Sequence, residues 1–410
     1  MMENIKNKDI QHVFIIGAKN IGSYGGYETF VEKLTQYHND NSYLQYYITC
    51  KSTGINKINE NNLNNITILS ENEFIHNNAR CFKINVPNIG PAQAIYYDIV
   101  SLKKCLNFIR IEDIRNPIIY ILTCRIGPFL NYFSKKIHRL GGKIFLNPDG
   151  HEWLRDKWIY PIKKYWRFSE KLMVKHSDLI ICDSKEIEKY INRNYQKYHP
   201  KTIFIPYGAD IINKETKNQK LNNWYQKYKI TSKNYYLIVC RFVPENNFEI
   251  IIREFMKSNS LKDLVIITTE NKNFKNKLEK KLHFSDDKRI KFVGTVYDED
   301  LLKQIRKNAF AYIHGHEVGG TNPSLLESLI ATDLNLLLNV KFNYEVAENG
   351  GLYFSKREWN LSNLIKKVES FSDDEIRNYS FKAKQRIYEL YNWETVTNMY
   401  QEVFYGKYSK

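Results

Sequence analysis

Short apolar runs alternate with amphipathic segments along most of the chain. Runs rich in β-branched and aromatic residues predict strands in the first half at 12–18, 44–50, 117–123, 143–147, 179–184 and 202–208. Residues 28–38 and 161–176 have apolar positions at helical spacing. Because alternating strands and helices are typical of a parallel sheet covered by helices, the pattern predicts an α/β protein.

The same pattern starts again in the second half. Strands are predicted at 235–242, 263–269, 290–296, 309–315 and 335–340, with helices near 246–257, 297–308, 323–331 and 373–390. Two such units, joined near 206–232, predict two Rossmann-like domains with a cleft between them, which we place at 1–210 and 211–390. One large α/β domain is the alternative. The Asn-rich stretch 56–65 is predicted to be a surface loop.

The composition narrows the class of protein. The 410 residues carry a net charge of +16, which suits nucleic acid, an anionic membrane or a phosphorylated substrate without choosing among them. The six cysteines are scattered, with no CxxC pair, which argues against zinc ribbons and disulfide scaffolds. The N-terminal segment is polar, and no apolar run approaches the ~18–20 residues of a membrane span. We therefore expect a cytosolic protein, either soluble or peripheral.

Two loops of the first half carry candidate chemistry. Gly25 and Gly26 lie in a glycine-rich turn between the first strand and a helix predicted to begin near Tyr27, where free amides would favour an anion. A plain strand–helix turn is the alternative. The segment 147–158 follows another strand and gathers Asp149, His151 and Glu152 with two tryptophans. A carboxylate there can accept a hydroxyl proton, and indole faces suit sugar rings; a structural Asp-Gly turn is the alternative.

Two loops of the second half suggest a diphosphate site. Arg241 ends the first strand of that half, where its guanidinium can bind phosphate, unless it forms an ordinary surface ion pair. The segment 314–327 joins a strand to a helix that begins at Pro323. Its candidate donor-binding residues are Gly319, Gly320, Thr321, Asn322, Ser324, Leu325 and Glu327. The backbone amides of Ser324 and Leu325, in the first turn of the helix, would be free to bind phosphate, and Glu327, one turn further on, could bind ribose hydroxyls. A simple capped helix is the alternative.

These motifs together resemble the GT-B fold glycosyltransferases of family 4, and within them the bacterial rhamnosyltransferases of capsule and cell-wall polysaccharide synthesis. The strings YGGYETFVEKL, NPDGHEW, FSEKL, CDSKEIEKYI, IPYGAD, RFVPENN and HEVGGTNPSLLE occur in the expected order. The resemblance implies that residues 391–410 form a helix crossing back to the first domain. It also implies that the second domain binds the donor, that the first binds the acceptor, and that no metal or other cofactor is needed.

The resemblance is inexact at the donor site. Arg241 corresponds to the arginine of the family's Arg–Lys pair, but the lysine falls at Asn246. The second acid of the family's two-Glu motif corresponds to Glu327, whereas the first falls at Gly319, so Glu317 is the candidate replacement. The departures occur in a GGTNP context that is similar to that of the rhamnosyltransferases.

The activity implied by the resemblance is transfer with retention of configuration. The donor would be a nucleotide diphosphate-sugar, with dTDP-β-L-rhamnose favoured, and the acceptor a lipid-linked saccharide. Asp149 would be the acceptor-side base, with His151 as the weaker candidate. The alternatives are a family 4 enzyme with a UDP- or GDP-sugar, another GT-B enzyme such as a nucleotide-sugar epimerase, and a non-catalytic basic protein that binds a membrane or nucleic acid. For the favoured interpretation no nucleic acid partner is expected.

Residues 155–175 suggest contact with an anionic membrane surface. Seven basic residues stand against two acidic ones, interleaved with five aromatic residues: Arg155, Lys157, Lys163, Lys164, Arg167, Lys171 and Lys175; Asp156 and Glu170; Trp158, Tyr160, Tyr165, Trp166 and Phe168. Such a segment suits the headgroup layer, and predicts a cytoplasmic protein on the inner face of the cell membrane. A helix whose aromatic side packs on the first domain is the alternative.

Overall fold

The computed structural model describes residues 10–23, 25–54, 57–155, 158–211 and 219–407. The described residues belong to two compact units. Unit 1 takes in Met1–Leu154, Trp158–Pro206 and Trp393–Lys410, and unit 2 takes in Arg155–Lys157 and Tyr207–Asn392. We describe each unit by itself.

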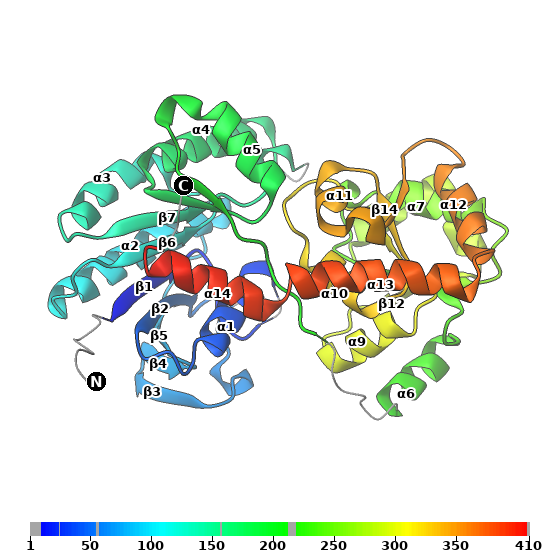
Figure 1. The fold of residues 1–410 in the computed structure, drawn as a ribbon, viewed down its shortest axis with the longest axis horizontal. Helices are drawn as coiled ribbons and strands as arrows, with labels where there is room; N and C mark the ends of the chain where they lie inside the picture. The colour runs from blue at the N-terminus through cyan, green and yellow to red at the C-terminus, as the bar shows by residue number, and fades with distance from the viewer. Residues whose placement is uncertain (1–9, 24, 55–56, 156–157, 212–218, 408–410) are drawn as a thin grey trace, which may run out of the picture. The chain divides into compact units, whose positions relative to one another are not determined.

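Unit 1 is built on a nine-stranded sheet in the order β3-β4-β5-β2-β1-β6-β7-β8-β9 (Figure 1). Its parallel part consists of β1 (Gln11–Ile16), β2 (Leu44–Lys51), β5 (Ala79–Ile84), β6 (Ile118–Leu122), β7 (Lys143–Asn147), β8 (Leu179–Cys182) and β9 (Thr202–Phe204). The edge strands β3 (Ile66–Ser70) and β4 (Glu73–His76) pair antiparallel. The helices are α1 (Gly26–Tyr37), α2 (Gln93–Ile111), α3 (Gly127–His138), α4 (Tyr160–His176), α5 (Lys185–Asn194) and α14 (Trp393–Phe404).

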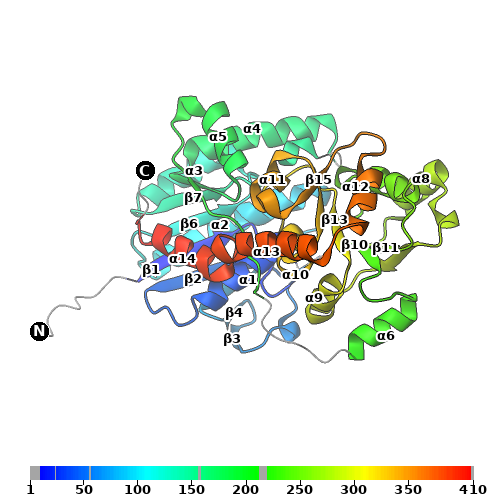
Figure 2. The same ribbon diagram turned by 45° about the vertical axis from the view of Figure 1, so that its right-hand side comes forward.

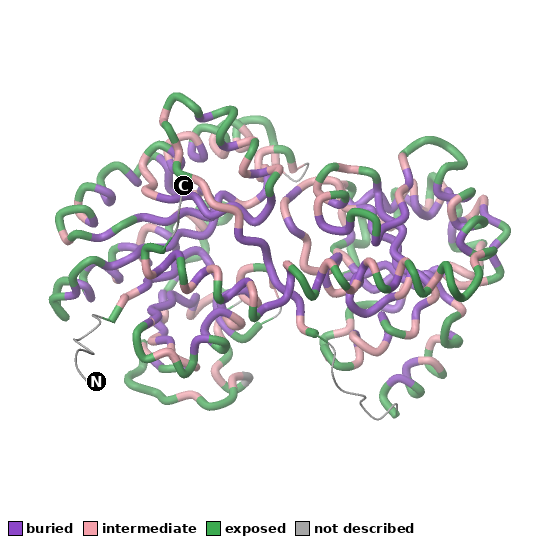
Figure 3. The backbone as a smooth tube through the Cα atoms, viewed as in Figure 1, coloured by how far each residue is buried: buried purple, intermediate pink, exposed green. Residues whose placement is uncertain are grey.

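Both faces of the unit 1 sheet are buried by helices. Adjacent residues of a strand point to opposite faces, and on β2 this separates Tyr47, which stacks on Phe14 and contacts Phe108 of α2, from Tyr46, which meets Phe404 of α14. Helix α14 therefore completes the core of unit 1 and lies beside α1 (Figure 1). The buried strands form the interior of the tube drawing in Figure 3.

Unit 2 is built on a six-stranded parallel sheet in the order β12-β11-β10-β13-β14-β15. Figure 2 labels four of these strands, β11, β10, β13 and β15, in the same sequence across the sheet. The strands are β10 (Tyr235–Val239), β11 (Asp263–Ile267), β12 (Ile290–Gly294), β13 (Ala311–His314), β14 (Asn335–Leu338) and β15 (Leu352–Phe354). The helices are α6 (Gln219–Tyr228), α7 (Phe248–Met256), α8 (Lys272–Leu282), α9 (Glu299–Lys307), α10 (Pro323–Ala331), α11 (Lys341–Ala347), α12 (Asn360–Glu369) and α13 (Asp373–Glu389).

The unit 2 sheet also has a core on each face. Tyr236 and Ile238 of β10 join a cluster with α7 and α12, whereas Tyr235 and Leu237 join a second cluster with α6 and α9. Figure 1 shows these two helix pairs on opposite sides of the sheet. A parallel sheet covered on both faces explains the nearly continuous apolar runs in its strands.

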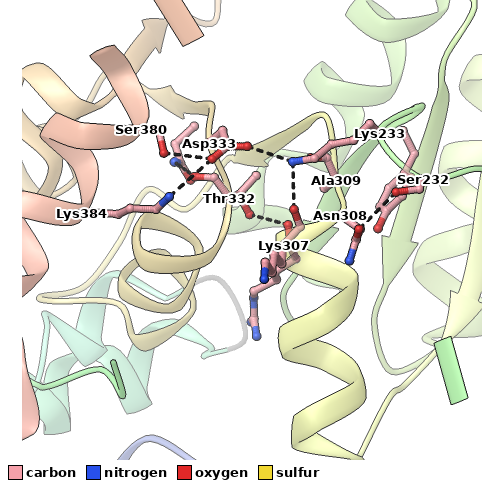
Figure 4. A network of polar contacts seen from close by, with 12 residues as sticks. Ser232, Lys233, Lys307, Asn308, Ala309, Thr332, Asp333, Ser380 and Lys384 are labelled. Atoms are coloured by element: carbon pink, nitrogen blue, oxygen red, sulfur yellow. Dashed lines mark hydrogen bonds and ion pairs between the residues drawn. The ribbon is translucent and has the colours of Figure 1, made fainter. Parts of the chain in front are cut away.

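Polar contacts around Asp333 join three segments of unit 2 (Figure 4). Asp333, between α10 and β14, pairs with Lys233 at 2.9 Å, accepts from Ser380 of α13 at 2.9 Å and lies 3.5 Å from Lys384. Lys233 also donates to the carbonyl of Lys307 at 2.9 Å. The chain entering β10 is thereby fastened to α9 and α13.

The predicted α/β class with two Rossmann-like units is confirmed. The main differences concern where elements end. The predicted strand 202–208 ends at Phe204 and the strand 235–242 at Val239, because apolar residues continue past the last ladder hydrogen bond into the loops. The antiparallel β3–β4 pair was not predicted, and its strands lie at an edge where several side chains are exposed.

Candidate functional site

The glycine-rich loop of unit 1 is shaped by close contacts between backbone segments. Gly17 has φ +104°, and a Cβ there would overlap the carbonyl oxygen of Leu122, so glycine is needed at this strand end. A Cβ at Gly25 would overlap the carboxylate of Glu28, which accepts the amide of Lys19 at 3.1 Å. Gly26 is exposed, with open space where a Cβ would be. Tyr24 lies outside the described residues.

The loop after β7 holds strained residues at the carboxyl end of the sheet. Asp149 has φ +60° and His151 φ +38°, and the neighbouring Thr123, after β6, has φ +82°, which is rare for a β-branched residue. Asn147 Oδ1 accepts the amide of Asp149 at 2.9 Å, and Asp149 Oδ1 accepts the amide of Gly150 at 2.8 Å. Strain of this kind is concentrated at functional sites, which strengthens the hypothesis that the loop has a chemical role.

His151 lies against an aromatic network. Its ring meets Tyr190 edge to face, with centroids 4.3 Å apart, and burial lowers its pKa, so the imidazole is neutral near pH 7. Tyr190 donates to the buried carboxylate of Glu170 at 2.7 Å, as does Tyr195 at 2.5 Å. Burial raises the pKa of Glu170. Glu170 was noted in the sequence only within the FSEKL string and among the acidic residues of 155–175, and nothing in the sequence connected it to His151.

Glu152 begins a short 3₁₀ helix, Glu152–Leu154, directly after His151. Its Oε1 accepts from the indole of Trp158 at 2.9 Å, and Trp158 contacts Trp166 of α4. The guanidinium of Arg167 lies over the ring of Trp153 at 5.2 Å. The indoles that were predicted to face a sugar therefore also connect the loop to α4.

An ion pair inside unit 1 was missed by the sequence reasoning. Arg125 follows β6, and its Nη1 lies 3.2 Å from both oxygens of Asp98, which is fully buried, and 3.0 Å from the carbonyl of Gly17. Burial raises the pKa of Asp98 to about 6, against the opposing effect of Arg125. The carboxyl-end loops of β1 and β6 are held together in this way.

Arg241 and Asn246 have different surroundings in unit 2. The side chain of Arg241 is exposed and forms no hydrogen bond or ion pair with any residue that the structure describes. Asn246 is 3% exposed; its Nδ2 donates to the carbonyl of Arg241 at 2.7 Å and its Oδ1 lies 2.7 Å from His316 Nδ1. Because Asn246 is almost fully buried and both of its polar atoms have protein partners, its side chain stabilises the Arg241 loop and has little surface left for a nucleotide-sugar.

The loop 314–322 packs closely on the Arg241 loop. A Cβ at Gly315 would overlap the carbonyl oxygen of Asn246, and Asn247 donates to the Gly315 carbonyl at 2.8 Å. Gly319 is buried with φ +140° and lies against the His316 ring. Burial, together with the charges of Arg155 and Arg241, lowers the pKa of His316 to about 4. Gly320 is half-buried and Thr321 buried in the same loop.

The prediction that the amides of Ser324 and Leu325 are free is wrong. Asn322 caps α10, accepting the Ser324 amide on its side chain at 2.9 Å and the Leu325 amide on its carbonyl at 3.0 Å. The Ser324 hydroxyl points inward, donating to the Val239 carbonyl at 2.8 Å and lying 2.9 Å from the hydroxyl of Tyr312. A good N-cap satisfies its own helix, so the capped-helix alternative describes these bonds.

The two candidate acids of the segment 314–327, Glu317 in the loop and Glu327 on α10, are both paired with cations that the sequence reasoning missed. Glu327 lies 2.6 Å from Nη2 of Arg306, which is 2% exposed, while the Glu327 side chain is 33% exposed. Glu317 lies 2.5 Å from Lys356, after β15, and 3.3 Å from Asn247 Nδ2. Arg306 and Lys356 are far from these acids in sequence, so only the fold brings them together.

Among the described residues, no group of three or more His, Cys, Asp and Glu side chains is arranged as metal ligands. Within the same ranges, no helix combines the length and apolarity needed to cross a membrane.

Comparisons with known proteins agree with this architecture. Residues 10–210 match a family described as a domain of unknown function, DUF1972. A sequence search against curated proteins gave no match. Similar solved structures include a glycosyltransferase from Rickettsia africae (TM-score 0.73, 13% identity, 98% of this chain and 99% of that one). Others are sucrose-phosphate synthase from Thermosynechococcus elongatus (0.69, 15%, 97% and 100%) and Anabaena HepE in complex with UDP and glucose (0.69, 13%, 97% and 100%).

At these identities the likeness defines the fold. The chain has the GT-B fold, as predicted, with two Rossmann-like domains.

Proposed function

We propose that the protein is a metal-independent glycosyltransferase that transfers a sugar from a nucleotide diphosphate-sugar to a saccharide acceptor. The observation that carries the proposal is the donor arrangement in unit 2. Arg241 follows the end of β10 and its side chain has no hydrogen bond or ion pair with the described residues, and its loop packs against the glycine-containing loop that leads into α10. HepE, which has the same fold, has been solved with UDP and with UDP-glucose, in support of a nucleotide-sugar donor.

In this proposal Arg241 binds the diphosphate with a planar, permanently charged donor fork. The positive end of α10 adds a favourable field for the same anion, although its first amides are capped. The Glu327 carboxylate, held by Arg306 and one-third exposed, is positioned to accept hydrogen bonds from ribose hydroxyls. Lys356 next to Glu317 supplies a second cation in the unit, where the family's lysine is replaced by Asn246.

Unit 1 supplies the acceptor side. The acceptor hydroxyl oxygen attacks the anomeric carbon while the bond from that carbon to the diphosphate oxygen breaks, and the departing diphosphate takes the electron pair. The hydroxyl proton passes to Asp149, the first candidate base, or to the neutral imidazole of His151. Attack on the face from which the diphosphate leaves gives retention. Stabilising that leaving group and holding both sugars in position then supply the rate enhancement.

We further propose dTDP-β-L-rhamnose as donor and a lipid-linked saccharide of surface polysaccharide synthesis as acceptor. The donor assignment rests on the similarity of the GGTNPSLLE segment to the rhamnosyltransferases. A lipid-linked acceptor would place the enzyme at the inner face of the cell membrane, as a peripheral cytoplasmic protein.

Helix α4 supplies a surface for such a location. Tyr160, Lys164, Phe168 and Lys175 are exposed and share one face of the helix, since they are spaced by whole turns. Lys164 lies over the Tyr160 ring at 4.6 Å. Lys163 is half-buried and Tyr165 donates inward to the Arg125 carbonyl at 2.7 Å, so only part of the segment 155–175 is available to a membrane. Asp156 and Lys157 lie outside the described residues.

The test is a panel of dTDP-, UDP- and GDP-sugars with a lipid-linked monosaccharide acceptor, assayed with and without EDTA. We expect transfer from one donor class, dependent on acceptor and unaffected by the chelator. Turnover of donor without acceptor would indicate an epimerase. A strict requirement for Mg²⁺ or Mn²⁺ would contradict metal independence, and no turnover with any donor, together with salt-dependent binding to nucleic acid or vesicles, would favour a non-catalytic basic protein.

A further inference from the structure

Three cationic residues, Lys19, Lys51 and Arg125, lie at or just after the carboxyl ends of three neighbouring strands of the unit 1 sheet, and Lys19 is exposed to solvent. Lys51 is the last residue of β2, Lys19 follows β1 and Arg125 follows β6, and the sheet order places β1 between the other two (Figure 1). The Lys51 amide donates to the Lys19 carbonyl at 2.7 Å, and Arg125 Nη1 donates to the Gly17 carbonyl at 3.0 Å. The segment Gly17–Lys19 is therefore bonded to both other cationic residues.

The charges in this cluster are only partly balanced. Arg125 is paired with Asp98. Neither the Lys19 ammonium nor the Lys51 ammonium forms an ion pair or hydrogen bond with the residues that the structure describes, and the nearby Glu28 carboxylate accepts the Lys19 amide rather than its side chain. Lys51 is 9% exposed. Burial and the charges of Lys19 and Arg125 lower its pKa, the effect expected when a cation is surrounded by like charge without a counter-ion.

An unpaired and largely buried lysine is unfavourable in the chain alone. Lysine stems often cover apolar surface while the ammonium reaches water, but that arrangement does not require two further cations beside it. Like charges gathered at the carboxyl ends of parallel strands, where this class of sheet binds ligands, are stabilised when an anion binds between them.

We propose that Lys19, Lys51 and Arg125 form an anion site in unit 1 that binds a phosphate group of the acceptor. This rests on the proposed function and deepens it, because it makes the acceptor a phosphorylated saccharide. The phosphate can belong to a lipid diphosphate or to a soluble sugar phosphate. Either way, the site recognises the acceptor by its charge, separately from the donor diphosphate in unit 2.

The first test measures binding and does not depend on activity. Inorganic pyrophosphate is the probe, in an Arg241→Ala background that weakens the donor site. Lys51→Met removes the charge and keeps the length of the stem, and Lys51→Arg restores the charge. The control is Lys143→Met, which removes a charge from the exposed first residue of β7, at the amino end of the parallel strands and so away from the proposed site. A ligand that binds the folded chain raises its melting temperature.

We expect pyrophosphate to raise the melting temperature of the background protein, of Lys51→Arg and of Lys143→Met. In Lys51→Met the apparent affinity should fall about 10–100-fold, the scale of one hydrogen bond to a charged group. Without pyrophosphate, Lys51→Met should melt no lower than the background, because a repulsive charge has been removed. Equal shifts in all variants, or no shift in any, would overturn the proposal.

The second test separates the two sources of phosphate and the two proposals. KM for the acceptor is measured with a lipid-diphosphate saccharide, a soluble sugar phosphate and an alkyl glycoside without phosphate. Lys51→Met should raise KM about tenfold or more for whichever phosphorylated acceptor is used, and leave KM for the alkyl glycoside and for the donor unchanged. An equal rise for all acceptors would overturn the anion site, whereas absence of transfer with every acceptor would contradict the proposed function while the pyrophosphate result still stands.

Discussion

At the scale of single residues, the partners of a side chain decide its role more than its place in a motif. Arg241, Asn246 and Ser324 occur in the two most specific segments of the sequence. The Arg241 side chain is exposed and has no hydrogen bond or ion pair with the described residues. The side chains of Asn246 and Ser324 instead donate hydrogen bonds to backbone carbonyls within unit 2. Glu327 also has a structural partner, because loss of its charge would leave the buried Arg306 without the carboxylate that pairs with it. Its substitution would therefore affect stability as well as donor binding.

This contrast predicts different effects for two substitutions. Arg241→Ala should lower kcat/KM by roughly 10²–10³-fold, the scale of losing one preorganised charge-assisted contact, with little change in melting temperature. Arg241→Lys should recover only part of the loss, since an ammonium lacks the planar fork. Ser324→Ala should instead lower the free energy of unfolding by about 1–2 kcal/mol, because the buried Arg306 guanidinium loses the hydroxyl to which it donates and the Val239 carbonyl keeps only its bond from Tyr312. Kinetics and denaturant unfolding measure the two quantities, and a fully active Arg241→Ala protein would show that the donor site lies elsewhere.

At the scale of helices and strands, the sequence predicts best where a cap and a periodic apolar face coincide. Helix α10 spans Pro323–Ala331 as predicted, because Asn322 caps it and Pro323 suits its first turn. The β3–β4 pair was missed although residues 66–69 of β3 are an apolar run, and the exposure of Ile68 and Leu69 shows that this run does not line a core. The loops of the candidate site could be located from their glycines and polar residues. Their partners Arg125, Glu170, Arg306 and Lys356 could not, because tertiary structure brings them there.

The Asp333 network predicts a pH dependence of stability. Burial alone would raise the pKa of Asp333, but Lys233, Ser380 and Lys384 outweigh it and hold the pKa below its usual range. A carboxylate with a lowered pKa in the folded state stabilises the fold above its unfolded pKa of about 4, and the contribution is lost as pH falls through the folded value. Asp333→Asn should therefore cost about 1–2 kcal/mol at pH 7 and progressively less below about pH 4.

The control for this prediction is Asp286→Asn, at an exposed position with no hydrogen bond or ion pair from its side chain to the described residues. Urea unfolding at several pH values measures the free energy for both variants and the parent chain. Equal behaviour of the two variants across the pH range would mean that the contacts around Asp333 do not stabilise unit 2.

At the scale of the whole molecule, the net charge of +16 can attract several kinds of anionic partner. A positive charge would favour all three of the proposed anionic partners, which are a donor diphosphate at unit 2, an acceptor phosphate at unit 1 and an anionic membrane. These uses differ in how salt affects them. Exposed charges separated by more than about 10 Å are screened near 0.1 M salt, whereas partly buried cations such as Lys51 are screened less. Rising salt should therefore weaken membrane binding before it weakens binding at either phosphate site.

The membrane prediction follows from the exposed face of α4. Each basic residue near an anionic bilayer contributes about 1 kcal/mol, so Lys164→Ser with Lys175→Ser should weaken binding to phosphatidylserine vesicles by about 2 kcal/mol, or about 30-fold. Phe168→Ser should also weaken binding, because the exposed Phe168 ring would bury apolar area in the bilayer. This loss should depend little on salt. The charge-matched control is Lys277→Ser with Lys280→Ser, on the exposed side of α8.

Co-sedimentation at low and moderate salt measures binding, and donor turnover with a soluble acceptor should be unchanged in all variants. Equal losses in the α4 and α8 pairs would mean that only the net charge attracts the protein to the bilayer, and undiminished binding of the α4 variants would remove α4 from the membrane contact.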